Sequence, residues 1–204
     1  MISNTSHNNE QLWDSFRNGD DFALAHIYDA QIQTLFKYGS KLSNDQAFVM
    51  DCIQDVFVDI INNRTTIGST DNIRFYLIRS LRNKMLRSLS KTNNISLLGD
   101  YSDFTFLLEA EFDDQLHEIE TNKHQRRRLR EAIGKLPERQ KEAIYLRYIM
   151  DFKNEEIAKI MDINYQAVRN TLYKAIENLR QTLSREDLIL FLMIWKSKIF
   201  ADRR

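Results

Sequence analysis

The sequence predicts an all-α protein built from two small helical domains that a linker joins. The chain of 204 residues contains only one Pro and five Gly, so it has few of the residues that favour tight turns. Apolar residues recur at helical spacings along most of the chain, whereas strand patterns are weak. With 43% hydrophobic residues, the chain can bury a core in one medium domain or in two small ones.

The first helices follow a break at Gly19-Asp20-Asp21. Apolar residues from Leu24 to Tyr38 mark one stripe of a helix after this break. Ser43 and Gln46 match a capping box, in which two side chains satisfy the free N–H groups at a helix start. A second helix is therefore expected to begin there and to run to about Ile61. Its buried stripe consists of Val49, Ile53, Val56, Phe57 and Ile60.

A further helix is expected from Ile73 to Lys91, after a polar connection over residues 63–70. Asp71 or Asn72 can cap its start. Its apolar residues recur at every fourth position, and because a helix turns once in about 3.6 residues, they form a slanting buried band. These residues are Ile73, Leu77, Leu81, Met85 and Leu89.

Charge is segregated along the chain, although 29 basic residues balance 29 acidic ones. Residues 72–91 carry six basic side chains and no acidic one, and residues 99–122 carry eight acidic side chains and no Lys or Arg. Residues 123–136 are basic again. Two basic blocks separated by an acidic spacer indicate more than a uniform solvated surface. The alternative is that the acidic residues simply keep a linker extended and soluble.

The most informative pattern is a helix-turn-helix over residues 154–180, which follows a helix start at Leu136-Pro137-Glu138. Residues 161–164 connect its two helices, and Asn164 is a good N-cap for the second. The second helix buries Val168, Leu172, Ala175 and Leu179, which leaves outside Tyr165, Gln166, Arg169, Asn170, Tyr173 and Lys174. Arg, Gln and Asn can pair with base edges in a major groove. The alternative is an ordinary helical hairpin with a polar outer face.

The remaining features exclude several classes of protein. We find no nucleophile–base pair, no cluster of metal ligands and no phosphate-binding Gly loop, so no enzymatic activity, cofactor or metal is expected. The single Cys, Cys52, is expected to be a small core residue. The start of the chain lacks the pattern of a secretory signal, and the longest apolar run, Leu188 to Trp195, is too short to span a membrane. These observations predict a cytoplasmic protein. The apolar run packs on a domain, which we favour, anchors the chain at a membrane surface, or forms part of a surface that binds a regulator.

Two halves of the sequence resemble the bacterial sigma-70 family, most closely its extracytoplasmic-function (ECF) branch. The segments "LPERQKEAIYLRY", "EEIAKIM" and "AVRNTLYKAIENLR" are similar to the family's region 4. Independently, "DCIQDVFVDIINNR" is similar to regions 2.1–2.2 and "FYLIRSLRNKMLRSL" to regions 2.3–2.4. The resemblance divides the chain into region 2 at 10–91, an acidic linker at 92–124, region 4 at 125–183 and an apolar tail at 184–204, expected as a short C-terminal helix.

The resemblance implies a sigma factor, which binds core RNA polymerase, directs it to promoters and assists their opening. The family's region 2.2 docks on the clamp helices of the largest polymerase subunit, and the matching residues are Asp51, Gln54, Asp55 and Phe57, of which Phe57 is better explained as core. Residues implied at the −10 element, where the family traps an unstacked base, are Tyr76, Arg79, Arg82, Asn83 and Arg87; Tyr76 can equally be buried. Those implied at the −35 element are Gln166, Arg169, Asn170 and Tyr173 in the groove, with Arg139 and Lys174 on the backbone.

Other implications concern the linker and a protein partner. In the family the linker threads the basic RNA path of the polymerase, where carboxylates can imitate nucleic acid. The family also implies an inhibitory anti-sigma factor, of which the residues themselves give no sign. The sequence departs from the family at Asp151 and Asp162, where Gly is common, although Asp tolerates the left-handed conformation better than most residues.

Two other functions compete with this interpretation. A stand-alone helix-turn-helix regulator of duplex DNA explains the second half of the chain, but neither the residues from Asp51 to Phe57 nor the basic helix from Ile73. A helical adaptor that does not bind DNA explains neither basic block.

Overall fold

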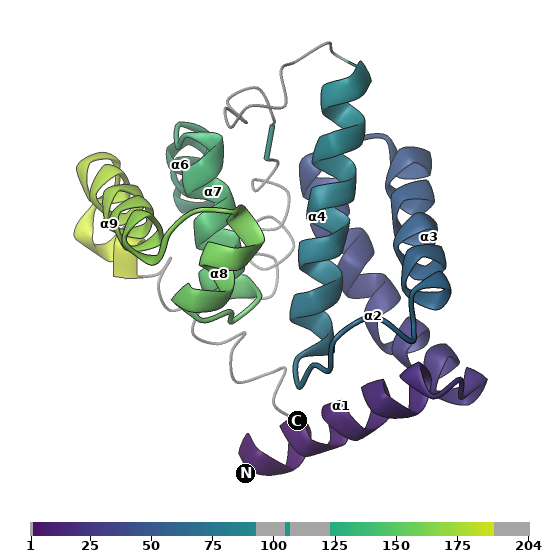
Figure 1. Cartoon of the computed structure of the whole chain (residues 1–204). Coiled ribbons are helices and arrows are strands. Elements are labelled where there is room, and N and C mark those ends of the chain that lie inside the picture. Colours follow the sequence, from purple (N-terminus) through teal and green to yellow (C-terminus); the bar gives the residue numbers. More distant parts are fainter. Residues whose placement is uncertain (1, 93–104, 107–122, 190–204) are drawn as a thin grey trace. The chain divides into compact units, whose positions relative to one another are not determined.

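The computed structural model describes residues 2–92, 105–106 and 123–189, and the chain divides into two compact units (Figure 1). Unit 1 comprises residues 1–104 and unit 2 residues 105–204. All regular elements within the described residues are helical, which confirms the all-α class. Most of the acidic linker and the tail from residue 190, including most of the apolar run, lie outside the described residues.

Within residues 2–92, unit 1 contains four helices that pack on one another. They are α1 (Ile2–Arg17), α2 (Asp21–Leu42), α3 (Gln46–Asn62) and α4 (Ile73–Thr92). Helix α2 contacts each of the other three, and α4 also contacts α1 and α3. The expected stripe of α3 is buried, and so are the first four residues of the slanting band on α4. Helix α1 extends well ahead of the first helix that apolar spacing predicted.

Polar side chains at the helix starts decide where three of these helices begin. Asp20 caps α2, and Asn72 caps α4 by accepting a hydrogen bond from the N–H of Phe75 at 3.0 Å. The expected cap of α3 was wrong: Asp45, not Ser43, accepts from the N–H of Phe48 at 3.1 Å. Ser43 is unsuited to that role because its own N–H still bonds to Gly39 and closes α2.

Close packing of α2 on its neighbours depends on Gly39. A Cβ atom at this position would lie 2.6 Å from Cγ1 of Val49 on α3, and within 4 Å of Met85 and Leu81 on α4. Real Cβ atoms are not found as close to another carbon as the Val49 contact would be, so Val49 or α3 would have to shift, whereas the contacts with α4 are ordinary. Gly39 therefore permits the close approach of α2 to α3.

We predict that Gly39→Ala destabilises unit 1, although Ala favours helix by about 1 kcal/mol over Gly. Overpacking costs typically about 1–3 kcal/mol, so a net loss is expected. Guanidinium denaturation followed by Trp13 fluorescence, in a Trp195→Phe background, measures the free energy of unfolding of unit 1. Gly68→Ala is the control, because a Cβ there meets nothing within 4 Å. Equal stability of the two variants would contradict the packing described for Gly39.

Unit 2 consists of α6 (Lys123–Gly134), α7 (Glu138–Ile144), a π-helical turn η1 (Tyr145–Ile149), α8 (Asn154–Met161) and α9 (Tyr165–Thr182), followed by helical residues 185–189. Pro137 was expected as the first residue of a helix, but it lies one position earlier, as the N-cap of α7. Phe106, from the segment assigned to the linker, is fully buried and packs edge-on against Tyr145, with ring centroids 5.5 Å apart. Its N–H also donates to the carboxylate of Glu138.

A paired carboxylate connects the end of unit 2 to its first helix. Asp187 is fully buried and accepts two hydrogen bonds from the guanidinium of Arg128 on α6, at 2.8 and 3.0 Å. These bonds hold the pKa of Asp187 below its ordinary value. The N–H of Asp187 bonds to the hydroxyl of Ser184, which caps this last described helical segment. The start of the C-terminal tail is thereby attached to the rest of unit 2.

We predict that this pair makes unit 2 sensitive to acid. Because the pKa of Asp187 is lower in the folded than in the unfolded state, the pair contributes its full stability above the unfolded pKa of about 3.9. The contribution is lost as pH falls from there through the folded pKa. Asp187→Asn should therefore flatten the fall in free energy of unfolding below about pH 4, measured by urea denaturation and circular dichroism. Glu186→Gln, an exposed neighbour, should keep the wild-type slope, and equal slopes for both variants would contradict the prediction.

Candidate nucleic-acid interface

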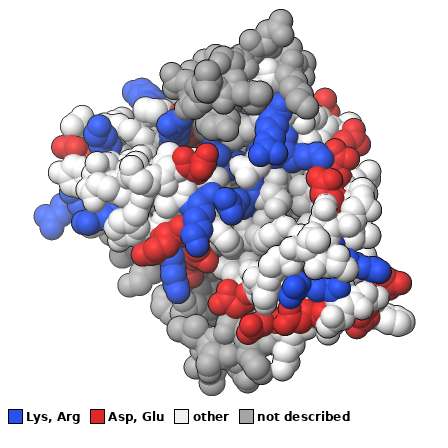
Figure 2. Space-filling model, viewed as in Figure 1, with Lys and Arg blue, Asp and Glu red and all other residues white. Residues whose placement is uncertain are grey.

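The outer side of α4 is basic, and the neighbouring α3 is acidic. Figure 2 shows Lys and Arg side chains gathered over α4, beside Asp and Glu side chains over α3. Arg79 and Arg87 are exposed on α4, and Asn83 is half-buried. Arg82 is different, since only 2% of it is exposed. Its assignment to the −10 element stays a prediction.

A groove of about 450 Å³ lies between α4, the end of α3 and the loop after it. Three of the residues expected at the −10 element line it: Tyr76, Asn83 and Arg87. Arg79 and Arg82 do not. Pattern reading missed the other polar groups of the groove, which are Asp59, Asn63, Thr66, Ser80 and Lys84. Most of them come from the loop or from helix ends that only the tertiary fold brings to α4.

Tyr76 is half-buried and lines this groove, and its contact with a DNA base stays a prediction. Its ring lies 5.0 Å from the ring of Trp13 on α1, and burial raises the pKa of its hydroxyl. Trp13 is itself fully buried and donates its indole N–H to the carbonyl of Gly68 at 2.9 Å. The Trp13 hydrogen bond fixes the loop after α3 against α1, and Tyr76 is the aromatic residue that lines the groove.

The outer side of α3 carries three of the residues expected to contact core polymerase. Asp51, Gln54 and Asp55 are exposed, whereas Phe57 is buried and packs against Tyr28 at 4.9 Å between ring centroids. Phe57 is therefore a core residue. Two exposed apolar side chains of α3, Val58 and Ile61, were not expected on this surface.

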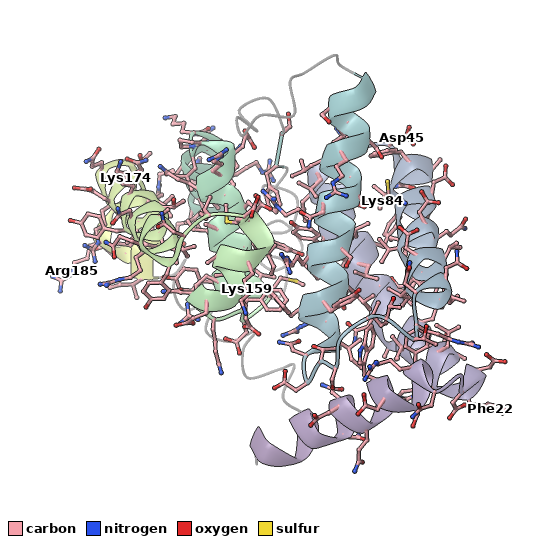
Figure 3. The ribbon with its side chains drawn as sticks, viewed as in Figure 1. Phe22, Asp45, Lys84, Lys159, Lys174 and Arg185 are labelled. Carbon is pink, nitrogen blue, oxygen red and sulfur yellow. The ribbon has the colours of Figure 1, made fainter. Side chains whose placement is uncertain are left out.

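Lys84 connects the acidic surface of α3 to the groove beside α4. Its ammonium lies 3.0 Å from Asp59 and 3.2 Å from Asp55, and the hydrogen bond to Asp59 is the main reason that its pKa is raised. Figure 3 shows Lys84 on the side of α4 that faces α3. The two carboxylates are about 60% exposed, so solvent screens these pairs and they contribute little stability. Asp55 therefore remains available to a basic partner.

Cys52, on α3, is buried as expected. Burial, followed by the nearby Asp55 carboxylate, raises the pKa of its thiol to about 11. A thiol that stays protonated at neutral pH is a poor nucleophile and a poor metal ligand. Among the residues that the structure describes, no group of three His, Cys, Asp or Glu side chains is arranged to hold a metal.

In unit 2 the turn between α8 and α9 has the geometry of a helix-turn-helix. Asp162 ends α8 in the left-handed conformation, with φ 54° and ψ 48°, and Asp151 adopts a similar φ of 55°. Asp therefore takes the conformation that Gly would otherwise supply at both positions. Asn164 caps α9 as predicted, accepting from the N–H of Ala167 at 2.8 Å.

The burial of one apolar stripe of α9 determines which of its side chains are exposed to solvent. Val168, Ala175 and Leu179 are fully buried, while Leu172 is partly exposed. The expected outer residues Tyr165, Gln166, Arg169, Asn170, Tyr173 and Lys174 are all exposed. Gln166 donates to Asn170 one turn later at 3.2 Å, so the two amides lie side by side. Arg139 lies apart from this row on α7, where it is half-buried.

Comparison with known proteins gives the same two regions. Residues 27–95 match the family profile of sigma-70 region 2, and residues 126–179 match that of sigma-70 region 4. RNA polymerase sigma factor SigV of Bacillus subtilis (strain 168) is 28% identical over 156 residues, which cover 76% of this chain and 88% of SigV. RNA polymerase sigma factor SigZ of the same organism is 24% identical, and the match covers 86% of this chain and 87% of SigZ. The ECF RNA polymerase sigma factor SigX, also of B. subtilis, is 23% identical, and the match covers 80% of this chain and 86% of SigX.

A solved structure shares the fold. The structure of CnrH in complex with the cytosolic domain of CnrY matches with a TM-score of 0.55 at 19% identity, and covers 84% of this chain and 94% of that one. Two helical units with a helix-turn-helix in the second define the class of protein. The chain belongs to the sigma-70 family of RNA polymerase sigma factors. It is a sigma factor of transcription initiation, whose partners are core RNA polymerase and promoter DNA.

No helix within residues 2–92 and 123–189 is long and apolar enough to cross a membrane.

Proposed function

We propose that this sigma factor recognises promoters at two points and holds one base of the opened strand in the groove beside α4. The groove of about 450 Å³ is the observation that carries the proposal. Its volume falls within the range of about 300–1,000 Å³ that is usual for small-molecule sites. A regulator that reads only duplex DNA has no use for such a groove, and the competing interpretation therefore leaves it unexplained.

The chemistry of the groove suits an unstacked nucleotide. Tyr76 offers an aromatic ring, Asn83 offers both a donor and an acceptor to a base edge, and Arg87 offers a charge to the phosphate. A base can use these groups only after it leaves the duplex. Contacts that exist only in the open state shift the equilibrium towards opening without ATP.

The outer side of α9 is suited to reading the −35 element. The neighbouring amides of Gln166 and Asn170 match the donor and acceptor pattern of adenine, and Arg169 matches that of guanine. Tyr173 and Lys174 continue the same exposed row, where Lys174 can bind the DNA backbone. Arg139, on α7, would bind phosphate beside them.

We assign the contact with core polymerase to the outer side of α3. Asp51 and Asp55 lie one helical turn apart with Gln54 between them, and all three are exposed. An acidic surface of this kind is complementary to a basic partner, which would be the clamp helices of the largest polymerase subunit. Exposed Val58 and Ile61 add apolar contact area on the same helix.

Two further parts of the proposal rest on the family rather than on the described residues. The acidic linker is proposed to follow the basic RNA path of the polymerase. An inhibitory anti-sigma partner is proposed as well, and in the related structure CnrH is bound to the cytosolic domain of CnrY.

Promoter selection by α9 is tested by transcription of a genomic library with core polymerase. We expect new start points only when the chain is added. Gln166→Ala with Asn170→Ala should reduce transcription from those start points at least about tenfold, since each lost base contact costs about 1–3 kcal/mol. Gln181→Ala, the same residue type on an exposed position of α9, is the matched control. An equal effect of the double variant and of the Gln181→Ala control would contradict the assignment of α9 to the −35 element.

Base capture by the groove is tested by comparing duplex promoters with promoters that contain a pre-melted bubble. Asn83→Ala with Arg87→Ala should reduce initiation from the duplex about tenfold, equivalent to about 1.4 kcal/mol. The defect should shrink on the pre-melted template, because opening no longer has to be driven by the groove. Asn44→Ala, in the exposed connection between α2 and α3, controls for loss of an amide. An equal defect on both templates would show that the groove does not assist opening.

A further inference from the structure

A second hollow of about 360 Å³ adjoins the loop that borders the base groove. Asn63, Thr66 and Ile67 of this loop line the base groove, whereas Arg64 and Thr65 line the second hollow. The end of α1 supplies its other residues, Asp14, Arg17 and Asn18. Consecutive residues of one loop thus contribute to two neighbouring hollows, both within unit 1.

The guanidinium of Arg64 is held over the turn between α1 and α2. A Cβ atom on Gly19 would lie 3.6 Å from its Cζ and Nη2 atoms, so the group packs directly on this turn. Gly19 has a φ of 95°, which a residue with a side chain adopts only under strain. Arg64 forms no ion pair with any described residue, so its charge is not neutralised by the protein there.

Arg17 is paired, but its donors are only partly used. Its Nη1 atom donates to Asp14 at 3.0 Å, and its buried Nε atom has no acceptor among the described residues. The lining of the hollow therefore carries two positive charges against one negative charge. The nearby carboxylate of Asp20 is occupied by the N–H groups of Phe22 and Ala23 as the cap of α2.

These groups suit a phosphate. Guanidinium groups bind phosphate oxygens with paired hydrogen bonds, and Asn18 and Thr65 add neutral donors at the same hollow. A base held in the neighbouring groove would bring its flanking phosphates to this side of the loop. We propose that Arg17 and Arg64 form a phosphate-binding site for the backbone of the DNA strand whose base enters the groove beside α4. The proposal rests on the proposed function of that groove.

The test measures the binding of a labelled single-stranded oligonucleotide with the −10 sequence to the full chain assembled with core polymerase, over a series of NaCl concentrations. Each phosphate contact on a single strand contributes about 0.7 to the slope of log affinity against log salt. Arg17→Gln with Arg64→Gln should lower the slope by about this amount and weaken binding roughly three- to tenfold at low salt. Lys37→Gln, an exposed basic residue on α2 outside both hollows, should leave the slope unchanged.

Arg64→Gln alone provides a second variant, because it keeps the pair between Asp14 and Arg17 and so guards against loss of folding. The slope of log affinity against log salt should also be lower for this variant than for the wild type. A wild-type slope in both variants would overturn the proposal, while the unaltered holoenzyme would still prefer the −10 sequence. Absence of that preference in the wild type would instead contradict the proposed function of the groove.

A second arm separates a DNA phosphate from a free anion. Thermal melting of the full chain is compared in inorganic phosphate and in chloride at equal ionic strength. Phosphate stabilisation that disappears in Arg64→Gln, together with an unchanged salt slope for the oligonucleotide, would mean that the site takes a free phosphate ion, and would overturn the assignment to DNA. A lowered salt slope supports the assignment to DNA.

Discussion

The candidate interface depends on the burial of one apolar stripe on α4 and one on α9. On α9, full burial of Val168, Ala175 and Leu179 turns Gln166, Arg169 and Asn170 outward. On α4, the band from Ile73 to Met85 does the same for Arg79 and Arg87. Because a helix is rigid, its buried residues determine its exposed ones, and a change in packing would turn away the side chains that we propose to contact DNA.

The loop after α3 has a comparable role in unit 1. It is fixed to α1 by the hydrogen bond from Trp13 to Gly68, and its residues line both hollows. Lys84 meanwhile reaches from α4 to Asp55 on the surface assigned to core polymerase. Docking of a basic partner on α3 would therefore act on a side chain that also borders the base groove. Lys84 thus lies between the surface that we propose for core polymerase and the groove that we propose for a base.

Local signals were enough to predict α2, α3, α4, α8 and α9, the outer face of α9 and several caps, but not α1. Asn164 and Asn72 cap as the sequence suggested, and Asp151 and Asp162 adopt the left-handed conformation that their positions require. Tertiary features were not predictable in the same way: Trp13 meets Tyr76, and Arg128 meets Asp187, across more than fifty residues of chain. The sequence did contain an indication that Arg82 is buried, because apolar Ile78 and Leu86 lie one helical turn before and after it. The sequence analysis followed a different line of residues on α4, which recurs every fourth position from Ile73.

Footprinting of the promoter complex measures most directly whether the two units act together on one DNA molecule, with permanganate reporting unpaired thymines at the −10 element and DNase I reporting protection of the duplex −35 element. With core polymerase and the full chain, thymines at the −10 element should become reactive while the −35 element is protected in the same complex. Neither effect should reach the same extent when the chain or the polymerase is added alone. Protection of the −35 element by the chain alone, with no reactive thymines after polymerase is added, would contradict joint action and would favour a regulator that binds only duplex DNA.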